Sequence, residues 1–342
     1  MIDIGEASLY QPLPGLLLPW YARHARKLPW RENKEPYRVW VSEIMLQQTR
    51  VEAVKDYYAR FLSALPDLAA LSRVDDDALM KLWAGLGYYS RARNMKKTAV
   101  LLMERGGEFP RDTKLLMTLP GVGEYTAAAI GSICFDLPTP AVDGNVVRIS
   151  ARLTAWEGEV DSPAVRRAIS QALTAVCPPE AGAFTQALME LGATVCLPNG
   201  APLCAKCPLA GICAAHRLRL ETAFPIKAPK KPRRAETKTV FLLTLPDGRA
   251  AFEKRPEHGL LGGLYQLPNL PGSLSPQEAL SLAEGWGVEP EALLASKERT
   301  HIFTHLEWHM TCYHIACRKE GTLAFFHPGE VPLPGAFAPF LR

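Results

Sequence analysis

Four cysteines gathered in one short stretch are the clearest sign of chemistry in this sequence. Cys196, Cys204, Cys207 and Cys213 are separated by seven, two and five residues. A secreted disulfide framework is shorter and more evenly cross-linked, and the N-terminus carries no segment of signal-peptide type. The cluster therefore predicts a metal site in a reducing compartment. Tetrahedral zinc sites usually show two close pairs, so the single Cys-x2-Cys favours an iron–sulfur cluster over zinc.

One carboxylate, Glu43, stands in an apolar segment. Apolar residues recur at three- and four-residue spacing from Val39 to Leu46, which predicts a helix. If Glu43 faces the protein interior, desolvation raises its pKa, as a general acid acting near neutral pH requires. The alternative is a glutamate on the solvated face of the helix, and this segment alone does not decide between the two.

A glycine-rich turn, Leu119-Pro120-Gly121-Val122-Gly123, lies between the predicted helical segments 113–118 and 126–133. Gly121 and Gly123 allow a tight turn and a close approach of the backbone to a ligand. The N–H groups of such a turn, together with the N-terminus of the next helix, form a ready phosphate site. The alternative is an ordinary connection between two helices.

The elements around these residues predict two domains. A length of 342 residues exceeds one ordinary domain, and 48% hydrophobic with 22% charged residues is globular usage. No apolar run reaches the ~18–20 residues of a membrane span. A net charge of +4 permits a polyanionic partner. Helical periodicity dominates residues 15–217, with examples at 78–85, 90–105, 161–176 and 182–195.

The chain changes character after the helical region. Residues 223–236 hold a basic, proline-containing run that cannot build a core, and we interpret them as a linker. Beyond it, segments 239–245 and 249–254 alternate around a Pro-Asp-Gly turn and predict a hairpin, while 307–317 alternates again. Segment 276–286 predicts one helix. The expected architecture is multi-domain: an all-α domain over 1–222, then an α+β domain over 237–342.

The glycine turn and an aspartate downstream of it together resemble the helix-hairpin-helix DNA glycosylase superfamily. Asp143 lies eighteen residues beyond Tyr125, in Val142-Asp143-Gly144-Asn145. The resemblance implies a helix-hairpin-helix at about 113–134 and a loop at 196–213 whose four cysteines bind one [4Fe–4S] cluster per chain. The family spacing has six residues in the first gap between cysteines where this chain has seven, which a loop absorbs.

Three further segments, 28–31, 43–49 and 85–91, are similar to the MutY family of adenine DNA glycosylases. This resemblance implies excision of adenine paired with 8-oxoguanine or guanine in double-stranded DNA, with Glu43 as the acid. Asp143 would stabilise the sugar cation or attack it, and Tyr125 and Asn145 would position the two carboxylates. Strand-cleaving relatives carry a lysine where this chain has Tyr125, so base removal alone is expected. The alternative for Tyr125 is core packing.

The same resemblance assigns the remaining site residues of the helical domain. For Glu190 the alternative to a role in the adenine pocket is a structural salt bridge, and for Trp30 the alternative is packing in the core. The residues expected to contact DNA or to fill the vacated base stack are Gly121, Gly123, Gln48, Thr49, Tyr88 and Arg91, and those expected to line the adenine pocket are Arg26, Trp30, Arg31, Leu46 and Glu190.

The C-terminal segment resembles a Nudix domain at 255–268 but lacks its hydrolase site. A Nudix box needs a helix with several carboxylates for magnesium, and 280–288 retains only Glu284. Segment 298–306 is similar to the family loop that contacts 8-oxoguanine, here through Phe303, Thr304 and His305. A plain turn between two strands is the alternative.

Three classes of function follow from these features: an adenine glycosylase, a Nudix pyrophosphohydrolase with a helical appendage, and a non-catalytic iron–sulfur DNA-binding protein. The missing Nudix carboxylates argue against the second, and the pair Glu43 and Asp143 argues against the third. We expect a monomer with no membrane association, located in the cytoplasm at the nucleoid.

Overall fold

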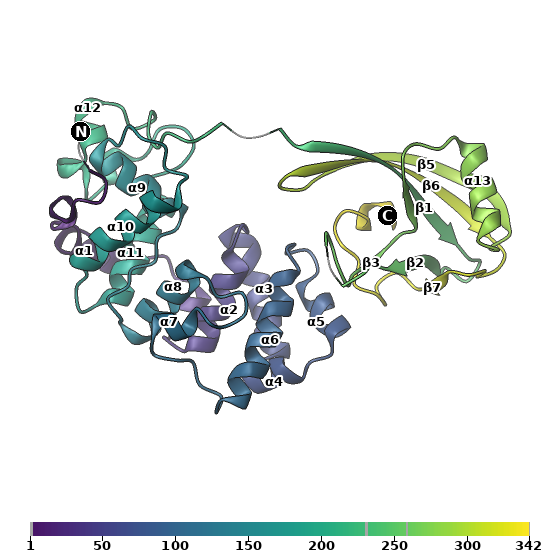
Figure 1. Ribbon diagram of the computed structural model, residues 1–342, viewed down its shortest axis with the longest axis horizontal. Coiled ribbons are helices and arrows are strands. Elements are labelled where there is room, and N and C mark those ends of the chain that lie inside the picture. Colours follow the sequence, from purple (N-terminus) through teal and green to yellow (C-terminus); the bar gives the residue numbers. More distant parts are fainter. Residues whose placement is uncertain (1–2, 230–231, 258, 342) are drawn as a thin grey trace. The chain divides into compact units, whose positions relative to one another are not determined.

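The structure is a computed structural model that describes residues 3–229, 232–257 and 259–341. The chain divides into two compact units, Met1–Arg73 with Asn94–Pro229, and Val74–Arg93 with Lys230–Arg342. Apart from a single bridge, the first unit is helical, and the second contains a seven-stranded sheet (Figure 1). The predicted class, an all-α domain followed by an α+β domain, is confirmed.

The helices follow the periodic segments to within a few residues. Side-chain oxygens accept hydrogen bonds from first-turn amides where Asp75, Asp112, Asp143 and Ser162 precede helices, which fixes those starts. In the described part of the chain, no helix has the length and hydrophobicity of a bilayer span. The α-helices are α1 Leu13–His24, α2 Pro36–Leu46, α3 Val51–Ala64, α4 Leu68–Arg73, α5 Asp76–Trp83, α6 Ser90–Glu104, α7 Thr113–Leu116, α8 Glu124–Phe135, α9 Gly144–Thr154, α10 Pro163–Ala175, α11 Ala181–Thr194, α12 Ala214–Leu218 and α13 Pro276–Gly285.

Helix α11 is central to the packing of the first unit, where it contacts α1, α8 and α9. Its side chains Phe184, Leu188 and Leu191 are buried in an extended apolar cluster of this unit. Helix α2 packs against α8, with Val39 in the same cluster as Ala129. These contacts bring residues from four helices, far apart in sequence, to one place.

The predicted linker is shorter than expected. Ile226 forms a bridge with Glu159, and the Ala228 amide donates to Asp161 Oδ2 at 2.8 Å, so residues up to 229 belong to the first unit. Strand β1 begins at Arg234. Residues 230 and 231 lie outside the described residues. The basic composition identified a connection, but the backbone bonds that hold its first half onto the first unit have no sequence signature.

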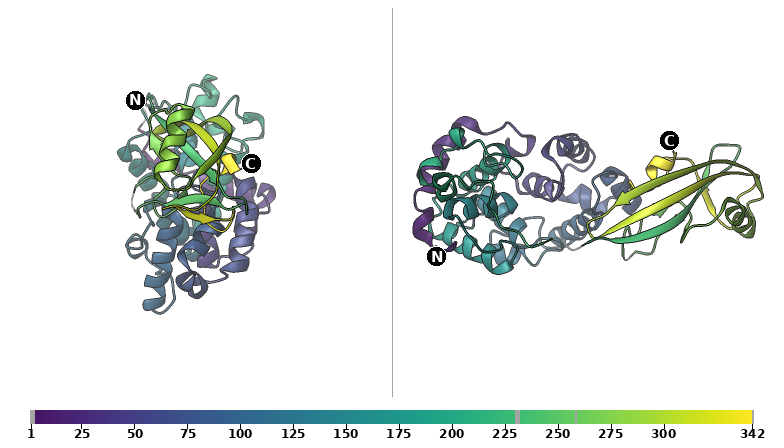
Figure 2. Two further views of the ribbon diagram at one scale, coloured as in Figure 1. Left: turned by 90° about the vertical axis from the view of Figure 1, so that its right-hand side faces the viewer. Right: turned by 90° about the horizontal axis from the view of Figure 1, so that it is seen from above.

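The sheet of the second unit has the order β3-β2-β1-β6-β5, with β4 on β1 and β7 on β2. The predicted hairpin forms, yet β1 and β2 pair only at Thr244 and Ala250, while β1 pairs in parallel with β6 over eleven residues. Figure 2 shows β1, β6 and β5 side by side as a long twisted ribbon. The strands are β1 Arg234–Thr244, β2 Ala250–Lys254, β3 Tyr265–Gln266, β4 Asn269–Pro271, β5 Pro290–Ile302, β6 Leu306–Cys317 and β7 Ala324–Phe326.

Candidate active site

A cavity of about 500 Å³ lies in the first unit, among side chains of α2, α8, α9 and α11. Its size is within the usual range for small-ligand sites. Sequence reasoning did not single out Gln186 and Met189 of α11, which also line it. The predicted site residues that it brings together are Arg26, Trp30, Arg31, Glu43, Leu46, Gln48, Thr49, Tyr125, Asp143 and Asn145.

Glu43 is on the buried face of α2, with 5% of its surface exposed. Burial raises the pKa of this carboxyl to about 7, and the negative charge of Asp143 adds to that rise. The Tyr125 hydroxyl, which donates to Glu43 Oε2 at 2.6 Å, and Arg31 act in the opposite direction. Glu43 therefore keeps a large protonated fraction near neutral pH, the state that a general acid needs. The surface alternative for Glu43 is wrong.

Asp143 is the N-cap residue of α9. Its Oδ1 accepts from the Val146 amide and its Oδ2 from Asn145 Nδ2, both at 2.8 Å. Burial raises the pKa of Asp143, and these hydrogen bonds oppose the rise. The two bonds fix both carboxylate oxygens while the residue lines the cavity. The same contacts give the predicted positioning partners a structural basis, Tyr125 on Glu43 and Asn145 on Asp143.

The raised pKa of Glu43 predicts a pH-dependent cost to stability. The unfolded chain releases this proton near the ordinary value of 4.5, whereas the folded protein holds it to about 7. Wild type therefore loses stability as pH rises through this window, and Glu43→Gln, which does not titrate, is spared that loss. Because the pKa values of the unfolded and the folded state differ by about 2.5, we expect the free energy of unfolding of the variant to rise by about 3 kcal/mol relative to wild type between pH 4 and pH 8.

Urea unfolding at the two pH values measures this difference. Glu32→Gln, which changes an exposed glutamate of the same unit, is the control and should show no such gain. An equal response of both variants to pH would mean that Glu43 is not protonated in the folded protein at neutral pH.

A chain of hydrogen bonds runs from Asp143 towards the cysteine loop, and sequence reasoning missed it. Asn145 Oδ1 accepts from Arg148 Nη2 at 2.8 Å, and Arg148 Nε donates to the Cys196 carbonyl at 2.9 Å. A Cβ at Gly192 would lie 2.4 Å from the Asn145 Cβ, so only glycine permits this approach of α11 to α9. The available signal was that the N-cap residue Asp143 is followed within five residues by Asn145 and Arg148, in the first two turns of one helix.

Glu190 is completely buried and forms a double ion pair. Arg26 donates to both of its carboxylate oxygens through Nε and Nη2, at 2.7 and 3.0 Å, and Arg31 donates to Oε2 at 2.9 Å. These bonds lower the pKa of Glu190 below its ordinary value, against the effect of burial. The salt-bridge alternative for Glu190 is therefore present, and it supports two side chains that line the cavity. Contact between Glu190 and adenine remains a prediction.

Two predicted base-stack residues have backbones in the left-handed region. Gln48 has φ 58° and Tyr88 has φ 47°, and both side chains are exposed. Such conformations cost energy in residues other than glycine and concentrate at functional positions. Arg91 differs from its prediction, because it is buried: its Nη2 donates to the Leu86 and Gly87 carbonyls and its guanidinium lies over the Tyr88 ring. Arg91 supports the turn that presents Tyr88.

The glycine hairpin has the geometry of an open amide turn. Gly121 has φ 74°, and a Cβ there would lie 2.7 Å from the Asn94 Cβ. Gly123 is the N-cap residue of α8 and supplies no side chain to its first-turn amides, which remain available to an anion. Thr98 fixes the turn by donating from its hydroxyl to the Pro120 carbonyl at 2.9 Å.

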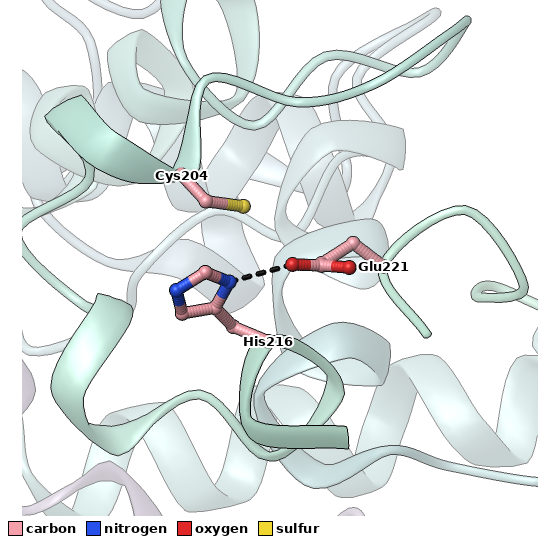
Figure 3. A group of neighbouring side chains, drawn as sticks. All are labelled: Cys204, His216 and Glu221. Atoms are coloured by element: carbon pink, nitrogen blue, oxygen red, sulfur yellow. Dashed lines mark hydrogen bonds and ion pairs between the residues drawn. The ribbon is translucent and has the colours of Figure 1, made fainter. Parts of the chain in front are cut away.

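The four predicted metal ligands line one small cavity, together with apolar side chains and with Arg152, His216 and Glu221. Burial and the charges of the neighbouring sulfurs raise the pKa of the Cys207 thiol to about 12, against the opposing effect of a backbone hydrogen bond at Leu209, so thiolates there need a cation to compensate them. The cysteines therefore fit a metal cluster. Beside Cys204, His216 Nδ1 lies 2.6 Å from Glu221 Oε1, a pair that fixes the end of the loop (Figure 3).

The predicted lesion-reading segment is the turn between β5 and β6. Phe303 is half-buried, with its ring 4.8 Å from that of Trp308, whereas Thr304 and His305 are exposed. Thr304 is hydrogen-bonded to the Tyr88 hydroxyl, which belongs to the same unit. The turn therefore consists of an anchored aromatic residue and two accessible polar groups.

Comparison with known proteins gives this geometry a family context. Residues 41–175 match the HhH-GPD superfamily of base excision DNA repair proteins, and residues 239–342 match the NUDIX domain. In solved structures, a thermostable thymine-DNA glycosylase is similar with a TM-score of 0.56 and 26% identity, over 62% of this chain and 98% of that one. An endonuclease III trapped on DNA has the same fold, with a TM-score of 0.53 at 24% identity, over 63% of this chain and 98% of that one.

Among curated proteins, the human adenine DNA glycosylase is 34% identical over 96% of this chain and 70% of its own length. The adenine DNA glycosylase of Buchnera aphidicola subsp. Schizaphis graminum is 36% identical over 74% of each chain. With this similarity along nearly its whole length, and with a buried acid and a capped aspartate in one cavity, the chain belongs to the adenine DNA glycosylase family.

Proposed function

We propose that this protein removes adenine from duplex DNA in which the adenine is paired with 8-oxoguanine or guanine, as a step of base excision repair. The observation that carries the proposal is that two carboxyl groups line one cavity: Glu43, which is hydrogen-bonded to Tyr125, and Asp143, which is hydrogen-bonded to Asn145. Glycosidic bonds are cleaved by two carboxyl groups in this manner.

The reaction begins with extrusion of the adenine, which costs a few kcal/mol and least at a mispair. Glu43 then donates its proton to the ring of the base, which converts a poor leaving group into a neutral one. Asp143 faces the developing positive charge on the sugar and stabilises it or forms a transient covalent bond, and water then adds to the anomeric carbon to give the abasic site. Tyr125 holds Glu43 through its 2.6 Å hydrogen bond and offers no amine for a Schiff base, so the strand stays intact.

A glycosylase assay tests the proposal directly. Duplexes that carry adenine opposite 8-oxoguanine, guanine or thymine are incubated with the protein, and alkali converts the abasic product into a strand break. We propose cleavage after alkali on the first two duplexes and none on adenine opposite thymine. Pyrophosphate release from nucleotides, without base loss, would favour the Nudix alternative, against which stands the single carboxylate, Glu284, in residues 280–288.

The cofactor belongs to the same proposal: Cys196, Cys204, Cys207 and Cys213 hold one [4Fe–4S] cluster, which orders the loop. Purified protein should be yellow-brown and contain about four iron atoms per chain. Cys207→Ser should lose the iron and the visible absorbance, because it removes one ligand. Cys134→Ser, at a cysteine outside this cavity, is the control and should retain both. Stoichiometric zinc in colourless protein would contradict the iron assignment.

The lesion reader is proposed to be the turn Phe303-Thr304-His305. Because Phe303 packs on Trp308, its truncation would disturb the sheet, and His305→Ala is the sharper test. We expect His305→Ala to slow excision opposite 8-oxoguanine about tenfold, the value of one lost hydrogen bond, and opposite guanine much less. His327→Ala, an exposed histidine of the same unit, is the control. Equal losses on both substrates would assign the turn to general DNA binding.

We propose mispaired duplex DNA as the substrate partner. We propose a monomer that acts in the cytoplasm at the nucleoid.

A further inference from the structure

A second pocket of the first unit, of about 370 Å³, carries an excess of positive charge. Arg148, Arg152, Arg166 and Lys227 line it, against Asp161 as the acidic residue among its described walls. We refer to these walls as the basic pocket. The residue distribution places it beside the first turn of α9, next to the cysteine loop at Pro198 and Gly200.

The four cations fall into two pairs with different roles. Arg148 and Arg152 are buried at 7% and 3% exposure, and their guanidinium groups are bonded to the Cys196 and Phe224 carbonyls. They form a rigid, positively charged wall of the pocket. Arg166 and Lys227 are exposed, and within the described residues neither has an ion-pair partner. Two cations without ion-pair partners, next to a positively charged wall, favour the binding of an anion.

Asp161 offsets one of these four positive charges, which leaves an excess of three. Its Oδ2 accepts from the Ala228 amide at 2.8 Å, which holds the segment carrying Lys227 against the loop before α10. Val160 donates to the Ile226 carbonyl at 3.0 Å and reinforces the same contact. The carboxylate is thus used to position Lys227 at the pocket.

The position of the basic pocket indicates which anion it takes. Gly144 lines it and is exposed, and Gly144 directly follows Asp143, the residue proposed to face the reacting sugar. Consecutive Cα atoms are 3.8 Å apart, and a DNA strand carries one phosphate per ~3.4 Å of helix axis. A strand whose sugar reaches Asp143 therefore has a phosphate close to Gly144, one of the residues that line the pocket.

We propose that the basic pocket binds a backbone phosphate of the DNA, with Arg166 and Lys227 as its ligands. This inference rests on the proposed placement of a sugar at Asp143. Its chemistry is that of a phosphate group, which DNA or free phosphate supplies, and we assign it to DNA. The pocket would fix the strand on the side of α9 that faces the cysteine loop, so that Asp143 meets the sugar in a constant register.

The test is the salt dependence of binding to an undamaged duplex, measured without any excision. A plot of the logarithm of the association constant against the logarithm of the salt concentration falls with salt. The variant Arg166→Gln/Lys227→Gln should make this fall less steep by about one and should weaken binding about fivefold at 0.15 M salt. Arg105→Gln/Arg167→Gln removes the same charge from exposed positions outside the pocket and should retain the wild-type slope. Because both variants change exposed side chains, we expect them to fold like wild type. The absorbance spectrum and the melting temperature of each variant check this.

Thermal shifts in inorganic phosphate, at matched ionic strength against chloride, distinguish the two sources of the anion. A reduced slope in the pocket variant alone supports the DNA assignment. Unchanged slopes, with a phosphate-induced stabilisation of wild type that the pocket variant lacks, would overturn it in favour of free phosphate. Unchanged slopes without that stabilisation would overturn the pocket as an anion site. Binding to an undamaged duplex does not require adenine specificity. A failure of the proposed function and a failure of the proposed phosphate site are therefore distinguishable.

Discussion

Glu43→Gln should lower the rate of adenine excision by about 10²–10⁴-fold while leaving affinity for mispaired DNA nearly unchanged. Glutamine has the shape and polarity of the acid, and its amide can still bond with the Tyr125 hydroxyl, which is 2.6 Å from Glu43 Oε2 in the wild type. It cannot deliver a proton. Because the side chain is buried, with 5% exposed, water does not replace it easily.

Single-turnover kinetics on adenine opposite 8-oxoguanine measure this effect, with binding measured separately on a non-cleavable duplex. Tyr125→Phe is the matched control, since it keeps the acid and removes only its partner. Excision by Glu43→Gln at a rate near wild type would mean that another group protonates the base.

Asp143→Asn should lower the excision rate by about 10²–10³-fold, because it removes the charge that faces the developing sugar cation. Asparagine is as good an N-cap as aspartate, so the bond from the Val146 amide to the side-chain oxygen and the start of α9 should persist. The amide group would, however, meet Asn145 Nδ2, which now donates at 2.8 Å. A small loss of stability should therefore accompany the large loss of rate.

Asp112→Asn separates the two effects. Asp112 caps α7 by accepting from the Leu115 amide, in the same manner as Asp143 but outside the cavity. Because asparagine caps a helix as well as aspartate, this variant should keep both its stability and its full activity, so a stability loss in Asp143→Asn alone would come from the contact with Asn145. If Asp143→Asn lost no more activity than Asp112→Asn, the charge at position 143 would have no part in the reaction.

The sequence alone determined the helices, the two-domain order and the identities of the principal groups. Apolar periodicity predicts the helix that carries Glu43, although it leaves open whether this side chain is buried or lies on the solvated face. The cysteine spacing likewise predicted that Cys204 and Cys207 share a site with two other cysteines. These features are local, so neighbouring residues in the chain carry them.

Only the tertiary structure decided which groups touch across the fold. That the Tyr125 hydroxyl reaches Glu43 rather than only packing beneath the hairpin depends on α8 lying against α2. Arg148 joins Asn145 to the cysteine loop because α11 comes close to α9 at Gly192.

The same limit applies to charges and to strand partners. Arg91 looked free to bind DNA, but its guanidinium is used inside a turn. The alternating pattern of β1 predicted a strand but not its parallel pairing with β6, some seventy residues away. Periodicity specifies burial, whereas partners are chosen by backbone hydrogen bonds and side-chain packing between distant segments, and no local pattern encodes that choice.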